Sequence, residues 1–274
     1  MQTGGMSFAP YLSRWSLEPD GLAIHTHSSD LLPVRHAEQA AMLKIARSEE
    51  ESRGNGLMVW WNGRGAAQVY EHDGPALLME RLEVWPSLTE MVAAGRDDEA
   101  TRILCQAAAQ LPRSRSWPEL PPLKRWFRGL EEAAPSVGGI FTLALTTAHE
   151  LLDSPQDVGV LHGDIHHGNL LSTAEGEWRF IDPKGLIGER GFDYANILCN
   201  PSLDTATAQG RLEGQARIIS DEAGLDYARL LRWTLAYAGL SAAWHLEDGE
   251  DETARRTLDV ARIAAAELGR STGI

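Results

Sequence analysis

The amino-acid sequence predicts an α+β fold of two lobes, and three observations lead to this prediction. Short strand-like runs are concentrated within residues 22–80. From Leu88 onward, apolar residues recur at spacings near three and four, which is typical of helices. The 274 residues, 43% of them hydrophobic, suffice for two buried cores. We predict a small antiparallel-sheet N-terminal lobe at residues 1–83 and a larger, mainly helical C-terminal lobe at residues 84–274.

The first lobe is expected to contain five strands, joined by turns rich in glycine, serine and aspartate. They are predicted at residues 22–26, 31–35, 40–45, 67–70 and 76–80. Lys44 lies inside the third, apolar run, where a lysine is unfavourable unless its ammonium group finds an anionic partner. We favour phosphate as that partner; the alternative is a lysine on an edge strand whose ammonium group reaches water.

The second lobe is expected to be built mainly of helices, with prolines such as Pro112 and Pro135 between the earlier ones. The segments concerned are residues 88–94, 99–111, 123–130, 140–152, 191–198, 206–220, 226–244 and 252–268.

Composition narrows the possible partners and location. The formal charge of −14 disfavours nucleic acid and anionic membranes as partners and suits a cationic substrate. No run of eighteen apolar residues occurs, and residues 1–10 lack the pattern of a signal peptide, so we expect a soluble, cytoplasmic protein. Cys105 and Cys199 are far apart in the sequence and suggest neither a disulfide framework nor a thiolate metal site.

The most informative stretch is His162-Gly163-Asp164-Ile165-His166-His167-Gly168-Asn169, followed thirteen residues later by Asp182. A strand is expected before it at residues 158–161, and a hairpin of residues 170–172 and 178–181 after it. That hairpin would return Asp182 to the side of Asn169. An acid five positions before an asparagine, then a second acid after a hairpin, is the arrangement used for phosphoryl transfer from a nucleoside triphosphate.

The residue types fit that chemistry. A hydroxyl group that attacks the γ-phosphate needs a carboxylate to orient it and accept its proton, and Asp164 is the candidate. Asn169 and Asp182 supply the hard oxygen ligands that magnesium requires. Lys44 is the candidate for pairing the α- and β-phosphates of ATP. This pattern predicts a kinase that uses ATP and Mg²⁺.

Two simpler interpretations compete with this one. His162, His166 and His167 could bind zinc, although no cysteine or further histidine stands nearby at ligand spacing. Asp164 and Asn169 could each be an ordinary turn residue. Their combination with Asp182 favours the phosphoryl-transfer interpretation.

At this point the sequence resembles a known family. The stretch of residues 162–169 and the segment Ile181-Asp182-Pro183-Lys184-Gly185-Leu186-Ile187-Gly188-Glu189 are similar to the aminoglycoside and hydroxyurea antibiotic resistance kinases, which include the streptomycin 6-phosphotransferases. Residues 59–66 and 239–244, with the acidic run after them, also match. The resemblance spans nearly the whole chain and implies a bilobal, protein-kinase-like fold.

The resemblance also implies roles for further residues. Glu51, by its register with the family, would hold Lys44, although only seven residues separate the two and Gly54 weakens the intervening helix. Ser28 and Ser29 would contact phosphates where protein kinases use glycines; alone, they would be a simple turn. Glu80 and Leu82 would offer main-chain hydrogen bonds to adenine at a hinge. His162 and Asp193 would support the catalytic loop.

An acidic run near the C-terminus has two interpretations. Residues 247–252 contain five acids in six positions, which usually means a solvated loop or helix start. In a kinase for amine- or guanidine-bearing sugars, Glu247 and Asp248 could instead line the substrate site while Trp244 packs on a ring.

These expectations combine into one functional hypothesis with two rivals. By resemblance, the substrate would be an aminoglycoside such as streptomycin, and its phosphorylation would confer resistance. The first rival is a kinase of the same mechanism acting on a metabolic sugar, an alcohol or hydroxyurea. The second is an inert nucleotide-binding protein, against which Lys44, Asp164, Asn169 and Asp182 together argue. The sequence does not predict the oligomeric state.

Overall fold

The computed structural model describes residues 7–83, 85–114 and 120–271, and its contacts divide the chain into two units. The first unit contains Met1–Pro86, Gln110–Pro112 and Asn169–Gly185, and the second contains Ser87–Ala109, Arg113–Gly168 and Leu186–Ile274. The structure therefore groups residues 169–185 with the N-terminal segment, whereas the sequence-based division at residue 83 placed them in the C-terminal lobe. Backbone hydrogen bonds explain the grouping, since Ala67 N donates to Phe180 O at 3.0 Å and Glu83 N donates to Ser172 O at 2.7 Å.

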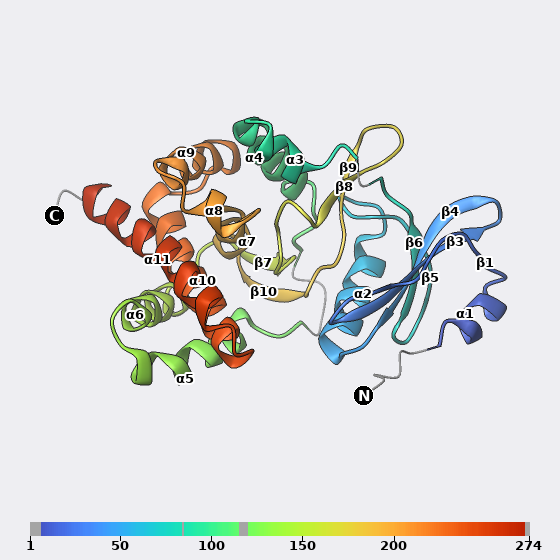
Figure 1. The fold of residues 1–274 in the computed structure, drawn as a ribbon, viewed down its shortest axis with the longest axis horizontal. Helices are drawn as coiled ribbons and strands as arrows, with labels where there is room; N and C mark the ends of the chain where they lie inside the picture. The colour runs from blue at the N-terminus through green and yellow to red at the C-terminus, as the bar shows by residue number, and fades with distance from the viewer. Residues whose placement is uncertain (1–6, 84, 115–119, 272–274) are drawn as a thin grey trace. The chain divides into compact units, whose positions relative to one another are not determined.

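An antiparallel sheet forms the centre of the first unit, as predicted (Figure 1). Its strands run in the order β1-β3-β4-β6-β5, and β2 pairs with β3. The strands are β1 (Glu18–Pro19), β2 (Ile24–His25), β3 (Ser29–His36), β4 (Gln39–Ala46), β5 (Val69–Asp73) and β6 (Ala76–Glu80).

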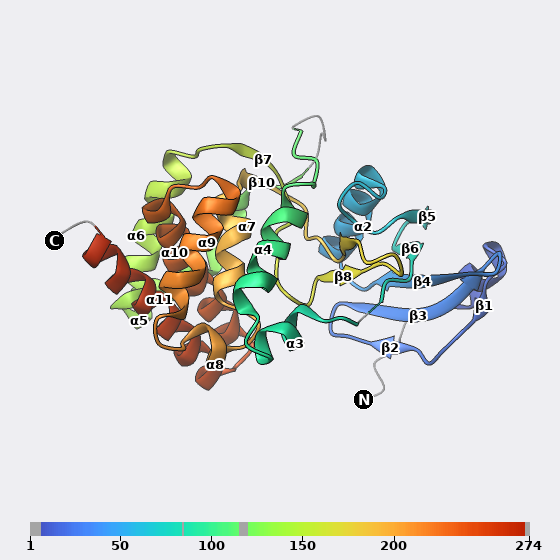
Figure 2. The ribbon, with the colours of Figure 1, turned by 90° about the horizontal axis from the view of Figure 1, so that it is seen from above.

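Two helices complete this part of the first unit. The short helix α1 (Ala9–Arg14) brings Tyr11 and Leu12 against the buried strand residues Leu32 and Val34. Helix α2 (Glu49–Trp61) contacts β4, β5 and β6 and lies along the sheet in Figure 2.

The hairpin predicted after the central motif is present in the first unit. It consists of β8 (Leu170–Ser172) and β9 (Trp178–Phe180), and Leu170 pairs with Phe180. Ile181 N donates to Asn169 O at 3.0 Å, so the hairpin brings the segment of Asp182 next to Asn169.

The second unit is mainly helical. Its two strands, β7 (Val158–Leu161) and β10 (Leu186–Glu189), form an antiparallel pair, and α10 and α11 run side by side (Figures 1 and 2). The helices are α3 (Leu88–Ala93), α4 (Asp97–Ala108), the 3-10 helix η1 (Leu123–Arg125), α5 (Arg128–Val137), α6 (Ile140–Asp153), α7 (Gly191–Leu198), α8 (Leu203–Ala206), α9 (Arg211–Ala223), α10 (Tyr227–Glu247) and α11 (Asp251–Ser271). Buried aromatic rings of Phe127, Phe192 and Trp233 meet in its core.

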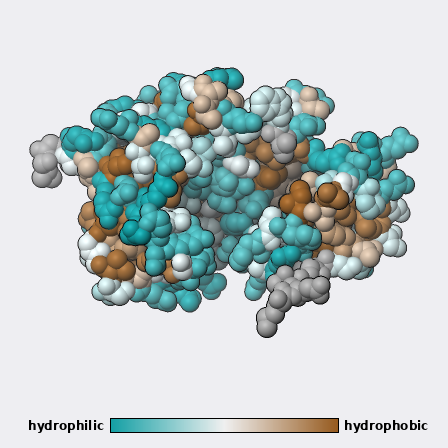
Figure 3. Space-filling model, viewed as in Figure 1, coloured by the Kyte–Doolittle hydropathy of each residue, from teal (hydrophilic) through white to brown (hydrophobic). Residues whose placement is uncertain are grey.

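Several helix boundaries differ from the sequence-based expectation. The segment 123–130 divides into η1 and α5, and Pro135 lies inside α5 instead of ending a helix. The segment 206–220 divides into α8 and α9, because Gly210 adopts a left-handed conformation with φ of 78° between them. Within the described residues, no helix is long and apolar enough to cross a membrane. The face in Figure 3 is largely hydrophilic, with smaller hydrophobic areas.

Candidate active site

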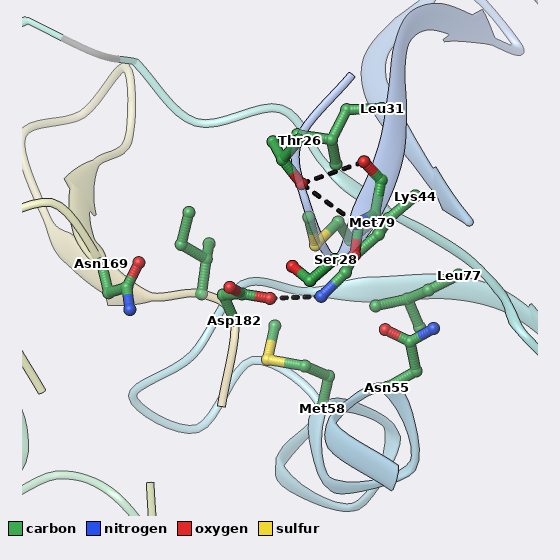
Figure 4. A pocket seen from close by; sticks show the side chains of 12 residues that line it. Thr26, Ser28, Leu31, Lys44, Asn55, Met58, Leu77, Met79, Asn169 and Asp182 are labelled. Atoms are coloured by element: carbon green, nitrogen blue, oxygen red, sulfur yellow. Dashed lines mark hydrogen bonds and ion pairs between the residues drawn. The ribbon is translucent and has the colours of Figure 1, made fainter. Parts of the chain in front are cut away.

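The first unit contains a pocket of about 200 Å³ that is lined by five of the residues singled out from the sequence: Ser28, Ser29, Lys44, Asn169 and Asp182. Figure 4 shows the ammonium group of Lys44 and the carboxylate of Asp182 pointing toward one another. The complete lining is Thr26, Ser28, Ser29, Leu31, Lys44, Asn55, Met58, Leu77, Met79, Asn169, Ile181 and Asp182. Polar groups therefore gather beside apolar side chains, as expected of a site that binds a phosphate-bearing ligand with an apolar base.

Lys44 and Glu51 form a buried ion pair in this pocket region. Lys44 Nζ lies 2.7 Å from Glu51 Oε2, and the side chains are 6% and 2% exposed. The gap of seven residues is sufficient because β4 ends at Ala46 and Ser48 caps α2, accepting a hydrogen bond from Glu51 N at 3.2 Å. Glu51 thus stands in the first turn of the helix, next to the strand that carries Lys44.

The two serines of the β2–β3 turn have different surroundings. Ser28 and Ser29 both line the pocket. The Ser29 hydroxyl donates to Glu51 Oε2 at 3.1 Å, so it helps to hold the glutamate. The expectation that both hydroxyls contact phosphates stays a prediction.

A second lysine, which the sequence did not single out for this site, completes a cluster of four charges. Lys184 Nζ lies 2.5 Å from Glu51 Oε1 and 3.2 Å from Asp182 Oδ2, while Lys44 pairs with the other oxygen of each carboxylate. We call Lys44, Glu51, Asp182 and Lys184 the charged ring. The available signal was a lysine two positions after the candidate metal ligand.

The charged ring keeps Asp182 ionised. Burial raises the pKa of its carboxyl group, but the positive charges of Lys44 and Lys184 outweigh burial and hold that pKa well below its usual range. An ionised carboxylate in the same pocket as the Asn169 side chain suits magnesium, which typically takes one or two protein oxygen ligands and completes its shell with phosphates and water. Within residues 7–83, 85–114 and 120–271, no group of three or more His, Cys, Asp or Glu side chains could hold a metal ion.

The two expected hinge residues do not line this pocket. Glu80 N donates to Gln68 O at 2.8 Å, and Glu80 Oε2 accepts from Gln68 N at 2.7 Å. Leu82 is buried. Main-chain contacts of Glu80 and Leu82 with adenine therefore stay a prediction.

In the second unit, hydrogen bonds hold both the carboxylate and the backbone of Asp164. Asn196 Nδ2, on α7, donates to Asp164 Oδ1 at 3.0 Å, and Asp164 N donates to His162 Nδ1 at 3.2 Å. His166 Nε2 lies 3.7 Å from Asp164 Oδ2. Sequence reasoning missed Asn196, and its only signal was a position three residues after Asp193 on the same predicted helix.

Asp193 fixes the backbone immediately before Asp164. Its two carboxylate oxygens accept hydrogen bonds from His162 N at 2.9 Å and Gly163 N at 2.7 Å. Burial raises the pKa of Asp193 to about 6, although the two backbone donors oppose that rise. These hydrogen bonds are consistent with the support of the catalytic loop expected of Asp193, and that role stays a prediction.

Asp164 opens into a second pocket, of about 290 Å³, which lies within the second unit. Neutral hydrogen-bonding groups and two histidines predominate in it, and Asp164 is its one carboxylate. The lining is Asp164, His166, Asn196, Cys199, Asn200, Pro201, Ser202, Leu203, Tyr237, Ser241, His245, Thr253 and Thr257. Its size and polarity suit part of a sugar-like molecule that presents hydroxyl groups.

The residues proposed from sequence for the substrate wall lie elsewhere on α10. Tyr237, Ser241 and His245 face the second pocket at intervals of four residues. Trp244 instead packs edge-on against Trp126, with ring centroids 5.2 Å apart. Glu247 and Asp248 are exposed, and neither they nor Trp244 line the pocket. Consecutive helical residues differ by about 100° in direction, so Trp244 lies on a different face of α10 from the residues that line the pocket. Substrate contacts by Trp244, Glu247 and Asp248 stay a prediction.

Comparisons with known proteins agree on one family. A family model described as aminoglycoside/hydroxyurea antibiotic resistance kinase matches residues 14–249. A streptomycin 3''-kinase of Klebsiella pneumoniae is 45% identical, covering 93% of this chain and 98% of the relative. A hydroxyurea phosphotransferase of Kitasatospora aureofaciens is 31% identical over 95% and 78%, and a streptomycin 6-kinase of Streptomyces griseus is 30% identical over 93% and 87%.

Solved structures with low identity show the fold. An aminoglycoside phosphotransferase in a ternary complex with AMP-PNP and hygromycin B matches with a TM-score of 0.66, covering 95% of this chain and 98% of that chain at 12% identity. A choline kinase of Streptococcus pneumoniae matches with a TM-score of 0.61, covering 96% and 97% at 14% identity. The predicted protein-kinase-like fold is confirmed.

Proposed function

Because this chain belongs to the aminoglycoside/hydroxyurea antibiotic resistance kinase family, we propose that it transfers the γ-phosphate of ATP to a hydroxyl group of streptomycin. The observation that carries the proposal is the carboxylate of Asp164, oriented by Asn196 at the mouth of a pocket rich in hydrogen-bonding groups. The phosphorylated drug would no longer act, so the reaction would confer resistance. Dependence on ATP also fits the cytoplasmic location that the sequence predicts.

Asp164 would act as the catalytic base in this reaction. Its carboxylate would orient the acceptor hydroxyl group and take its proton as the oxygen attacks phosphorus. Asn196 would keep the carboxylate turned toward the acceptor, and Asp193 would fix the backbone that carries it. These contacts limit the motion of the base before substrate arrives.

The first unit would bind and orient the nucleotide. Lys44, held by Glu51, would contact the α- and β-phosphates, and Asn169 and Asp182 would supply oxygen ligands to magnesium. Magnesium, when bound, would neutralise charge that develops on the phosphates. The apolar side chains of the pocket, including Met58 and Met79, would exclude water from this region.

For the acceptor position we propose the 3'' hydroxyl group of streptomycin. Identity to the streptomycin 3''-kinase is 45%, against 30% to the two streptomycin 6-kinases, with similar coverage of this chain. Hydroxyurea is the second candidate substrate, since the hydroxyurea phosphotransferase is 31% identical.

The test is ADP release from magnesium ATP with streptomycin, hydroxyurea and a panel of other aminoglycosides. We expect streptomycin-dependent turnover that Asp164→Asn abolishes and that Asp259→Asn, an exposed acid of α11, leaves intact. NMR of the product would identify the phosphorylated hydroxyl group. A 6-phosphate would refute only the positional proposal. If no compound of the panel stimulates ADP release while a cellular sugar or alcohol does, the proposed substrate is refuted. An Asp164→Asn variant as active as the unaltered chain would refute the proposed mechanism.

A further inference from the structure

The charged ring uses two of the three lysines in the chain. The sequence contains Lys44, Lys124 and Lys184, and the first and last converge on Glu51 and Asp182. In the kinase pattern one lysine and one glutamate suffice to position the phosphates. Lys184 is therefore a second cationic side chain at a site where Lys44 already supplies one.

The contacts of Lys184 divide into one that is compatible with bound metal and one that is not. Its contact with Glu51 Oε1, at 2.5 Å, involves a buried carboxylate that is not a candidate magnesium ligand. The other oxygen of that carboxylate is bound by Lys44 and Ser29. Its contact with Asp182 Oδ2, at 3.2 Å, involves the candidate magnesium ligand. An ammonium group and a divalent cation at one carboxylate repel each other, so each weakens the binding of the other.

Glu51 provides a position to which Lys184 can withdraw. Helix α2 holds Glu51 through the Ser48 cap, and this carboxylate is 2% exposed, whereas that of Asp182 is 30% exposed. Lys184 can release Asp182 and keep its shorter contact with Glu51, so its charge stays paired in both arrangements.

We propose that Lys184 is a positioning residue that occupies Asp182 when no metal is bound and yields that carboxylate to magnesium when magnesium nucleotide binds. Lys184 then has two opposed effects. It supports nucleotide binding without metal, because it adds positive charge near the phosphates. It also competes with magnesium for Asp182. The inference rests on the proposed function only in placing magnesium nucleotide in this pocket.

The test is the thermodynamic coupling between magnesium and ADP, which requires no acceptor and no turnover. Calorimetry gives the Kd of ADP in EDTA and in saturating magnesium. The Kd in EDTA divided by the Kd in magnesium measures the coupling. In Lys184→Met and Lys184→Gln we expect this ratio to rise about tenfold or more, since a unit charge a few ångströms from a partly buried ligand is worth at least that factor. The rise has two sources: weaker ADP binding in EDTA and relief of competition in magnesium.

Three controls separate this mechanism from general damage. Lys184→Arg keeps the charge and should retain the ratio of the unaltered chain. Lys124→Met makes the same substitution at an exposed lysine of the second unit and should leave both Kd values unchanged. In an Asp182→Asn background the Lys184→Met substitution should raise the ratio less, because the contested carboxylate is gone and only the weaker ADP binding in EDTA remains; an undiminished rise would overturn the competition for Asp182. Thermal unfolding confirms that each variant is folded.

Several results would overturn the proposal. If both Kd values rise by one common factor in Lys184→Met, Lys184 only supports the pocket. If Lys184→Arg raises the ratio as much as Lys184→Met does, the effect is not one of charge. Failure of streptomycin turnover would leave all these measurements interpretable, so the two proposals can fail separately.

Discussion

Replacement of Gly54 by alanine tests how closely α2 must approach the segment that carries Asp182. A Cβ atom at Gly54 would lie 2.0 Å from the carbonyl oxygen of Pro183, and real Cβ atoms essentially never come within 3.0 Å of such an atom. Helix and segment would have to separate by about 1 Å, since the Cβ is attached rigidly to the helix backbone and the oxygen belongs to the backbone of the segment. The glycine that weakened the sequence-based helix prediction is thus required for close packing.

The expected loss is larger in activity than in stability. Alanine gains about 1 kcal/mol over glycine in a helix, and overpacking costs about 1–3 kcal/mol, so the free energy of unfolding should fall by about 2 kcal/mol at most. Pro183 lies between Asp182 and Lys184, which both belong to the charged ring with Glu51, one turn before Gly54. A displacement of about 1 Å there should lower kcat/KM roughly a hundredfold.

Steady-state ADP release and urea unfolding would measure the two effects. Gly214→Ala in α9 is the matched control, because a Cβ at that exposed helical glycine has no neighbouring atom within 4 Å. It should stabilise the protein by about 1 kcal/mol and leave activity unchanged. A Gly54→Ala variant that is fully active and equally stabilised would refute the close-packing argument.

Three further predictions concern the second unit. Asn196→Ala should lower kcat about a hundredfold with little change in the Kd of ADP, because it frees the Asp164 carboxylate; an equal loss in both would contradict this. The raised pKa of Asp193, about 6 against an ordinary value near 4, means that the folded state binds its proton more tightly, so the free energy of unfolding should fall as pH rises from 4 to 6. Urea unfolding across that range should show a smaller fall in Asp193→Asn, and equal slopes would argue against the shift. Arg229→Met should cost about 3–5 kcal/mol in urea unfolding, since it removes a buried partner from Glu189, and a loss below 1 kcal/mol would count against that pairing.

Local chemistry made part of the site predictable from sequence. The β8–β9 hairpin is short, so Asn169 and Asp182 had to lie near each other once its two strands were recognised. Glu51 was identified through its register with the family, and the structure adds a local reason, because a serine cap three residues earlier fixes where the helix begins.

The remaining features depend on packing between distant segments. Asn196 reaches Asp164 across 32 positions, and only the placement of α7 against the loop reveals it. The sequence did not indicate which face of α10 meets the pocket. This helix is buried around most of its circumference, so apolar periodicity does not mark that face. The sequence therefore pointed to Trp244 for the substrate site, whereas the neighbouring His245 lines the second pocket. The only local signal for Lys184 was its position two residues after Asp182, since its other partner, Glu51, lies 133 positions away.

The two pockets share no lining residue, and this has an evolutionary consequence. Under the proposed function, substitutions at Ser202, Ser241 or Thr253 would alter which drugs fit without changing a side chain of the proposed nucleotide pocket. Selection by a new antibiotic would then act on one set of codons and leave those for phosphate chemistry unchanged. A drug modified to avoid binding in the second pocket could be countered by substitutions there. A compound that fills the pocket beside Lys44 would instead bind residues that the proposed phosphate chemistry constrains.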